Sequence, residues 1–348
     1  MCERIARPGI AVAAVLLFLG IGVSACQRAV DYQIERNLTR ADRGVLTSPD
    51  LTVVLCGTGS PLPDRTRASA CTAVIAGGQF VLVDIGPGSW KTADLVNLPT
   101  ADLSAILLTH FHSDHIGDLG EAVVQSWIAG RAQPLDVYGP AGTAQVVEGF
   151  RLAYAQDAGY RVKHHGEAYL PGAAGTAIAH EVALGDEADA SAVVFERGGL
   201  RVTMFRVDHS PVSPAVGYRF DYRGRSVVVS GDTRRSDSVV EHAKGADLLV
   251  HEALQKDMVA HVAEVAGRMG LARLAKLASD IPAYHTSPVE AAEVARAAGV
   301  KHLVLTHLVP APTNFLTRRW FVAGMSDVYP GPITIGADGM RFTLTPSS

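Results

Sequence analysis

The order of apolar and polar residues along the chain predicts short strands that alternate with amphipathic helices. Apolar runs bounded by Gly, Pro and polar residues are typical of strands. Such runs cover residues 51–56, 72–75, 79–85, 105–108, 135–138, 200–207, 215–222, 226–230, 248–251 and 302–306. Apolar residues recur at helical spacing over residues 119–129, 143–156, 237–243, 258–278 and 288–298. This order predicts two sheets covered by helices, a layered α/β sandwich.

The first 50 residues have a different pattern from the rest. Arg4 and Arg7 precede an apolar run over residues 10–23 that ends in small residues, which is the layout of a secretory signal. The following Ser24-Ala25-Cys26 completes a motif that resembles the bacterial lipobox, in which the cysteine is lipidated. We therefore expect a signal peptide with a lipobox over residues 1–26, a polar linker over residues 27–50 and a hydrolase domain over residues 51–348. The alternative is an uncleaved membrane anchor, because the apolar run is near the minimum length for a membrane span.

These features predict an exported protein, a lipoprotein of the periplasm or cell envelope that is attached to the membrane by its N-terminal lipid. The chain has 31 Lys and Arg against 35 Asp and Glu, a formal net charge of −4. Because polyanion binding needs clustered Lys and Arg, nucleic acid is not an expected partner. Cys56 and Cys71 could form a disulfide in an oxidising compartment, but two separate buried thiols are the favoured prediction.

One short stretch concentrates side chains that bind metal ions. Residues 109–118 read THFHSDHIGD, directly after an apolar strand. Irregular backbone after a strand can aim several ligands at one point. His110 and His112 can bind one metal ion, and Asp114 and His115 can bind a second. Imidazole and carboxylate together favour zinc, with manganese or iron as alternatives.

A second strand near the C-terminus has the same ending. Residues 105–110 (AILLTH) and residues 302–307 (HLVLTH) are both apolar strands that end in Thr-His. If the two halves of the sandwich are pseudo-equivalent, His110 and His307 emerge at the same edge.

The motif over residues 110–115 (HFHSDH) resembles the signature of the metallo-β-lactamase superfamily. Further segments are similar to its ribonuclease Z and arylsulfatase branch, namely residues 57–64, 82–88, 208–209 with 217–220, 230–233, 251–253 and 284–286. Residues 127–131 with 135–140 resemble the arylsulfatase-like members in particular. The resemblance extends over most of the chain from Leu51, and it implies a four-layer αββα sandwich.

The resemblance also implies a pair of metal ions, two Zn²⁺ with Mn²⁺ or Fe²⁺ as alternatives. The first ion would be held by His110, His112 and His209, the second by Asp114, His115 and His307, and Asp232 would bridge them. Two adjacent cations lower the pKa of a water molecule between them and neutralise the oxygens of an ester anion.

Catalytic roles for other side chains are implied in the same way. Asp114 would orient the attacking water as well as bind metal, His285 would protonate the leaving group, and Glu252 would orient His285. Asp84 is a candidate hydrogen-bond partner of a ligand histidine, or a turn residue before Gly86.

One departure from ribonuclease Z guides the substrate prediction. In that family a long arm that grips transfer RNA precedes the Gly-Asp-Thr segment, whereas here Tyr218 and Asp232 are joined by one short hairpin. We therefore predict a small-molecule anionic ester as substrate, an aryl or alkyl sulfate. The alternatives are a phosphodiesterase or a ribonuclease Z-like endonuclease, then a β-lactamase or a non-catalytic metal-binding lipoprotein. Residues 310–320 are expected to border the pocket, and a homodimer is one option for assembly.

Overall fold

The computed structural model describes residues 26–347, which belong to two compact units, one that ends at Asp42 and one that starts at Arg43. In the first unit, residues 26–38 form a helix where the sequence predicts a polar linker. The predicted signal peptide lies almost wholly outside the described residues, and Cys26 is an exposed free cysteine. Within residues 26–347, no helix combines the length and apolar character needed to cross a bilayer.

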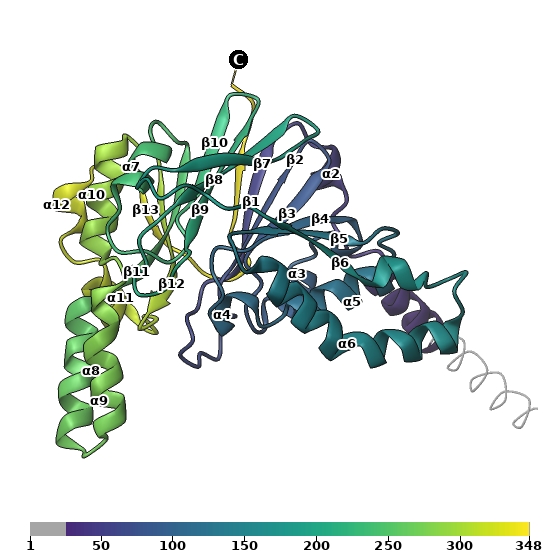
Figure 1. Cartoon of the computed structure of the whole chain (residues 1–348), viewed down its shortest axis with the longest axis horizontal. Helices are drawn as coiled ribbons and strands as arrows, with labels where there is room; N and C mark the ends of the chain where they lie inside the picture. Colours follow the sequence, from purple (N-terminus) through teal and green to yellow (C-terminus); the bar gives the residue numbers. More distant parts are fainter. Residues whose placement is uncertain (1–25, 348) are drawn as a thin grey trace, which may run out of the picture. The chain divides into compact units, whose positions relative to one another are not determined.

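Two seven-stranded sheets form the framework of the second unit (Figure 1). The first sheet has the order β14-β1-β2-β3-β4-β5-β6, and the second has the order β13-β12-β11-β10-β9-β8-β7. The first sheet comprises β1 (Leu51–Gly57), β2 (Cys71–Ala76), β3 (Gln79–Val83), β4 (Leu103–Leu107), β5 (Leu135–Gly139), β6 (Ala177–Glu181) and β14 (Arg341–Leu344). The second comprises β7 (Ser191–Arg197), β8 (Leu200–Arg206), β9 (Val216–Tyr222), β10 (Arg225–Val229), β11 (Leu248–Leu254), β12 (Leu303–Val309) and β13 (Ile333–Ile335).

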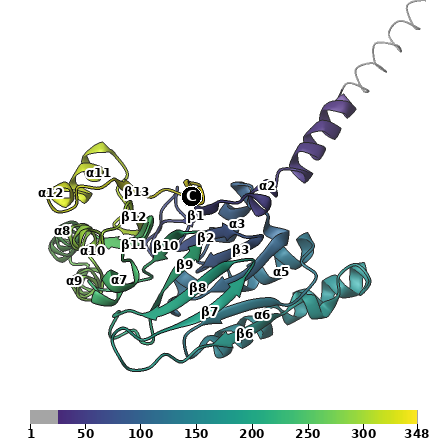
Figure 2. The ribbon, with the colours of Figure 1, turned by 90° about the horizontal axis from the view of Figure 1, so that it is seen from above.

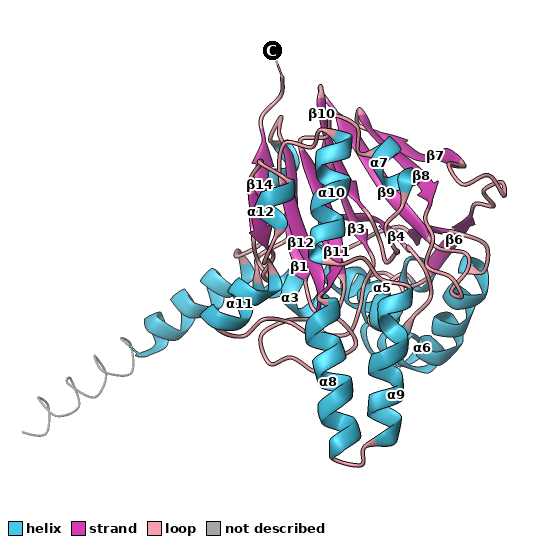
Figure 3. Ribbon diagram, turned by 90° about the vertical axis from the view of Figure 1, so that its left-hand side faces the viewer, coloured by secondary structure: helices cyan, strands magenta, loops and turns pink. Residues whose placement is uncertain are grey.

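Helices cover the outer face of each sheet, as Figure 2 shows from above. On the first sheet lie α3 (Ser89–Leu95), α5 (Leu119–Ala129) and α6 (Thr143–His165). On the second lie α7 (Asp237–His242), α10 (Pro288–Ala298), α11 (Phe315–Phe321) and α12 (Met325–Val328). Two further helices, α8 (Lys256–Arg268) and α9 (Ala272–Asp280), form a hairpin that projects beyond the sheets (Figure 3). The short helices are α2 (Gly44–Thr47), α4 (Ser113–Ile116), η1 (Thr100–Asp102), η2 (Gly172–Gly175) and η3 (Ile281–Ala283).

Strand β1 shows why the central strands read as continuous apolar runs. Val53 and Leu55 pack between the two sheets, whereas Val54 packs under the helices of the first sheet. Because successive side chains point to opposite faces, a strand buried on both faces is apolar at most of its positions. The predicted αββα sandwich is confirmed.

Four strands were not predicted because they lie where the apolar pattern is weak. β6, β7 and β14 are partly exposed along their length, and β13 has only three residues. The single helix predicted over residues 258–278 is two helices, because the chain turns at Gly270, whose φ is +73°. α6 continues past the predicted residue 156 to His165.

The prediction of two free thiols is wrong, because Cys56 and Cys71 form a disulfide. β1 and β2 are antiparallel neighbours with a register shift between Leu55 and Gly57. This irregularity places Cys56 beside Cys71, with a Cα–Cα distance of 5.0 Å. The register between the strands decides the pairing, and spacing along the chain does not reveal it.

Candidate metal and catalytic centre

The metal-capable side chains emerge where several strands end at one edge of the sandwich. His110 and His112 follow β4, and α4 then carries Asp114 and His115 on a single helical turn. His209 follows β8 and Asp232 follows β10, whereas His307 lies within β12. The structure thus brings together every metal ligand that the resemblance implies.

The first group of ligands consists of three histidines. The ligand atoms of His110, His112 and His209 lie within 4.8 Å of one another. Nε2 of His110 is 3.0 Å from Nδ1 of His112. His209 donates its Nδ1 hydrogen to the backbone oxygen of Tyr284 at 2.9 Å, and its buried Nε2 has no hydrogen-bond partner.

The second group combines a carboxylate with two histidines. Oδ2 of Asp114 lies 3.1 Å from Nε2 of His307, and the ligand atoms of Asp114, His115 and His307 lie within 4.8 Å of one another. Asp232 stands between the groups, with its Oδ2 3.3 Å from Nε2 of both His115 and His307. The same oxygen is 4.0 Å from Nε2 of His110 and of His209, so it can bridge two cations.

The charge states of His110, His209 and Asp232 fit a pair of bound cations. Burial holds the pKa of His110 well below its usual range, and burial also lowers the pKa of His209. Burial opposes ionisation of Asp232, but the neighbouring His307 and His115 hold its pKa well below the usual range. A neutral imidazole and an ionised carboxylate are the forms that bind metal. Burial opposes protonation of His115, but Asp232 and Asp84 raise its pKa well above the usual range, so a cation bound there would displace its proton. Buried nitrogens without partners on His115, His209 and His307 add to the fit.

His307 is positioned by an irregularity in β12. The pairing of β11 with β12 passes from Glu252–Thr306 to Ala253–Leu308, which leaves His307 as an extra residue. Its φ is +46°, in the left-handed region that residues other than glycine rarely adopt. A β-bulge redirects the side chain of the extra residue, and here the imidazole points at the cluster.

Asp84 fixes the orientation of a ligand. Its Oδ2 accepts hydrogen bonds from Nδ1 of His115 and from Oγ1 of Thr109, both at 2.8 Å. Its Oδ1 accepts from the backbone N–H of Thr109 at 2.8 Å. These three bonds tie the start of the loop after β4 to the end of β3, so Nε2 of His115 is the nitrogen left for metal.

His285 and Glu252 form a hydrogen-bonded pair beside the cluster. Nδ1 of His285 donates to Oε1 of Glu252 at 2.9 Å, and the same oxygen accepts from the backbone N–H of Thr286 at 3.0 Å. Burial opposes protonation of His285, but the charge and hydrogen bond of Glu252 raise its pKa to about 9. A protonated imidazole beside a metal cluster can donate a proton to a leaving group.

Comparison with known proteins assigns the family. Residues 80–308 match the model of the beta-lactamase superfamily domain. The chain belongs to the metallo-β-lactamase superfamily. A protein named Ribonuclease Z from Mycobacterium bovis is 39% identical over 299 residues, which cover 85% of this chain and 99% of that relative. The Mycobacterium tuberculosis protein of the same name is 37% identical over the same shares of both chains.

A solved structure agrees with this assignment at the level of the fold. The crystal structure of human tRNase Z, short form, superimposes with a TM-score of 0.60 at 22% identity, covering 84% of this chain and 99% of that one. Together with the sequence relatives, this likeness supports the ribonuclease Z branch of the metallo-β-lactamase superfamily.

The predicted sulfate ester substrate is wrong, and so is the prediction that nucleic acid is not a partner. Relatives that this chain matches over almost their whole length are named Ribonuclease Z. The prediction against nucleic acid was based on net charge, which describes the whole surface. A scissile phosphate is recognised by the cations of the site itself. A sulfate monoester and a phosphodiester both carry one negative charge on a tetrahedral centre, so the ligand residues alone did not separate them.

A cavity of about 390 Å³ lies in front of the cluster. His112, Asp114, Asp232, His285 and His307 form its metal side. Apolar residues of the hairpin α8–α9, which the sequence did not identify as part of the site, also line the cavity. Of the predicted border over residues 310–320, only Pro310 lines the cavity. One sequence signal could have revealed the hairpin part of the lining. Over residues 256–280, apolar residues recur at helical spacing between charged ones.

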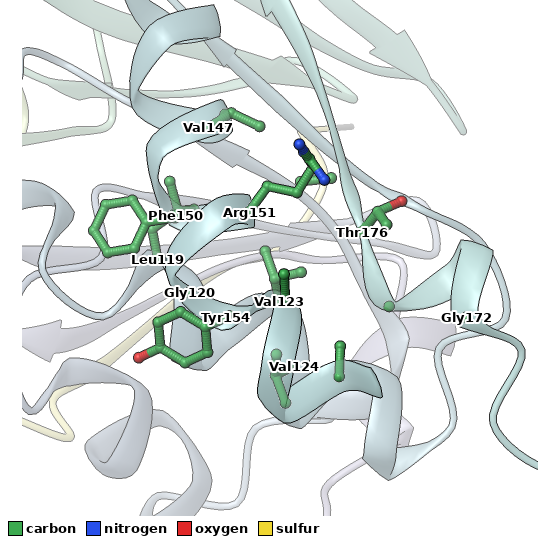
Figure 4. Close-up of a pocket in the computed structure, with 14 residues that line it drawn as sticks. Leu119, Gly120, Val123, Val124, Val147, Phe150, Arg151, Tyr154, Gly172 and Thr176 are labelled. Carbon is green, nitrogen blue, oxygen red and sulfur yellow. The ribbon is translucent and has the colours of Figure 1, made fainter. Parts of the chain in front are cut away.

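The motif over residues 127–131 has a structural role. The guanidinium of Arg131 is buried and donates to the backbone oxygens of Val123, at 2.7 Å, and Ala174, at 2.8 Å. It therefore fixes the C-terminal end of α5 against the segment before β6. A second cavity, of about 210 Å³, lies beside α5, and Figure 4 shows Val123, Phe150 and Tyr154 around it. None of its lining residues belongs to the metal cluster.

Proposed function

We propose that this protein is a metal-dependent ribonuclease of the ribonuclease Z type, which cleaves one phosphodiester bond in a precursor transfer RNA. One observation carries the proposal. A complete set of convergent ligands, with the His285–Glu252 pair beside it, occurs in a chain that is 39% identical to a Ribonuclease Z over 99% of that relative.

The donor set favours zinc in both positions, with manganese or iron as alternatives. His110, His112 and His209 would hold one ion, and Asp114, His115 and His307 the other, with Asp232 shared between them. When bound, two such ions activate a water molecule and neutralise the non-bridging oxygens of a phosphodiester.

The protein's own side chains supply the remaining steps. The carboxylate of Asp114 borders the cavity and accepts a proton from the attacking water, which orients the oxygen toward phosphorus. His285 also borders the cavity, and its free Nε2 donates a proton to the oxygen of the departing nucleotide. Glu252 keeps Nδ1 of His285 protonated and therefore keeps Nε2 aimed at the cavity.

The test uses the full chain loaded with Zn²⁺ or Mn²⁺ and a precursor transfer RNA that carries a 3′ extension. We expect one discrete cleavage at the 3′ side, abolished by chelation and restored by added metal. The Asp232→Asn variant removes the shared carboxylate charge with little change of shape, and it is expected to lose metal and activity together. The matched control is Asp136→Asn, which alters a carboxylate of β5 that pairs with His180 of β6.

A wild-type protein that binds metal and hydrolyses bis-nitrophenyl phosphate, but leaves precursor transfer RNA intact, would exclude the ribonuclease proposal. Well-folded protein that contains only a trace of transition metal by elemental analysis, and whose hydrolysis is indifferent to chelators, would exclude the metal centre as well.

A further inference from the structure

The cavity in front of the metal cluster is lined by two chemically different sets of residues. One set consists of the ionisable groups of the cluster. The other includes the residues that we call the apolar wall: Val259 and Val262 of α8, Leu274 and Leu277 of α9, and Ile281 of η3. A substrate that fills the cavity therefore meets both charged groups and hydrocarbon.

The apolar wall is fixed to the body of the domain at its base. Val259 is buried in a small cluster with Leu254, Ala278 and Val309, which joins the hairpin to the ends of β11 and β12. Lys256 at the start of α8 forms an ion pair with Glu290 of α10, with an Nζ–Oε2 distance of 2.7 Å. The wall is therefore held at a set position relative to His307, which lies on the same strand as Val309.

Two leucines of the wall are exposed. Leu274 is 43% exposed and Leu277 is 55% exposed, and both line the cavity. The same helix carries Lys276 and Asp280, which form an exposed ion pair instead of lining the cavity. Apolar area left in water is unfavourable, so a ligand that covers these leucines gains binding energy from them.

The lining also defines which part of a substrate can reach the wall. No Lys or Arg is among the described residues that line the cavity. A phosphodiester anion is therefore held at the metal side, and a second phosphate group would find no partner near the leucines. The group that extends toward the wall must be uncharged and must present an apolar face. In an RNA substrate, the flat face of a nucleobase has these properties.

We infer that the apolar wall is a base-binding subsite, in which the unpaired base of one nucleotide next to the scissile phosphate packs against Leu274 and Leu277. This inference rests on the proposed ribonuclease function. Tyr284 lines the same cavity, its ring centroid lies 5.1 Å from that of His209, and its ring provides an aromatic surface for the base.

The test compares Leu277→Ser with a conservative variant at the same position and with a control outside the cavity. Leu277→Met keeps an apolar side chain at the same position, and Met269→Ser changes a residue at the hairpin tip that is 68% exposed and does not line the cavity. Each protein is assayed on precursor transfer RNA with normal bases, and on versions with an abasic ribose at either nucleotide flanking the scissile phosphate. Thermal melting shows that each variant is folded, and Leu274→Ser serves as a second variant.

We expect Leu277→Ser to raise KM for the normal substrate about 5- to 150-fold, with a smaller change in kcat, as loss of one base contact implies. On one of the abasic substrates, the wild type is expected to have the raised KM that Leu277→Ser has on the normal substrate. On that abasic substrate, Leu277→Ser is expected to raise KM no further. Met269→Ser is expected to behave as the wild type on all substrates, and Leu277→Met, which keeps an apolar contact with the base, is expected to raise KM much less than Leu277→Ser does.

Equal effects of Leu277→Ser on normal and abasic substrates, or no effect on any, would overturn the base-binding subsite while leaving the ribonuclease proposal intact. A change of oligomeric state in Leu277→Ser with a uniform loss of activity would identify the wall as a subunit interface and would overturn it too. Failure of the wild type to cleave any precursor, while it hydrolyses bis-nitrophenyl phosphate, would instead remove the ribonuclease proposal and the subsite with it.

Discussion

Nδ1 of His115 lies 2.8 Å from Oδ2 of Asp84, and this contact links a candidate metal ligand in the loop after β4 to the end of β3. The carboxylate holds the imidazole with Nε2 toward Oδ2 of Asp232, 3.3 Å away. Asp84 and His115 are 31 positions apart, and only the adjacent positions of β3 and β4 bring them together.

We predict that Asp84→Asn weakens metal binding in the position of His115 by roughly 10- to 100-fold, because the ligand loses the charged partner that fixes its tautomer. Competition with a chromogenic chelator measures the change. Asp102→Asn, which removes a partner of Arg43 on the surface, is the control and is expected to bind metal as the wild type does. If the affinity for metal is unchanged in both metal positions, Asp84 only stabilises the turn and does not orient His115.

Asp114→Asn is predicted to lower kcat on bis-nitrophenyl phosphate by roughly 10²-fold or more, with a much smaller change in KM. The amide can still occupy the position but cannot take a proton from water. Metal content must be measured alongside, because Asp114 also lies in the second ligand group. Turnover like that of the wild type at full metal content would remove Asp114 from the mechanism.

His285→Ala is predicted to reduce cleavage of esters with poor leaving groups by roughly 10²- to 10⁴-fold. Nitrophenyl esters are expected to lose much less, since a nitrophenolate departs without a proton. Steady-state rates on RNA and on bis-nitrophenyl phosphate give the comparison. Equal losses on the two substrates would contradict the assignment of His285 as proton donor.

The pH dependence of RNA cleavage follows from the same pair. Burial opposes the charge on His285, but Glu252 raises its pKa to about 9. A raised pKa means that the proton-donating form is present at lower pH and is lost as pH rises through that value. Bound cations repel the imidazolium, so the falling limb is expected at or below pH 9. In Glu252→Gln this limb is predicted to move to lower pH, and a limb that does not move would assign it to another group.

Reduction of the Cys56–Cys71 disulfide is predicted to lower the free energy of unfolding by roughly 3 kcal/mol, because the bond closes a loop across a sequence separation of 15 residues. Urea denaturation of oxidised and reduced protein measures the difference. Cys56→Ser with Cys71→Ser is expected to match the reduced protein, and an agent that reduces disulfides is expected to have no effect on this variant.

The sequence determined the local chemistry of this protein. Residues 110–115 place four metal-capable side chains within one turn region, and no tertiary contact is needed to recognise them. The apolar runs of the central strands, such as β1 and β4, were equally clear, because strands buried on both faces cannot contain exposed polar positions. The fold class followed from these elements.

The tertiary structure decided what depends on contacts between distant residues. The bulge that aims His307, the pairing of Cys56 with Cys71 and the contact of Asp84 with His115 all arise from strand register. The apolar wall exists because α8 and α9 project beside the cluster. Apolar periodicity alone cannot distinguish such a projecting helix from a helix packed in the core. A sequence pattern states which side chains are apolar or can bind metal, whereas only the packed chain determines which of them share one cavity.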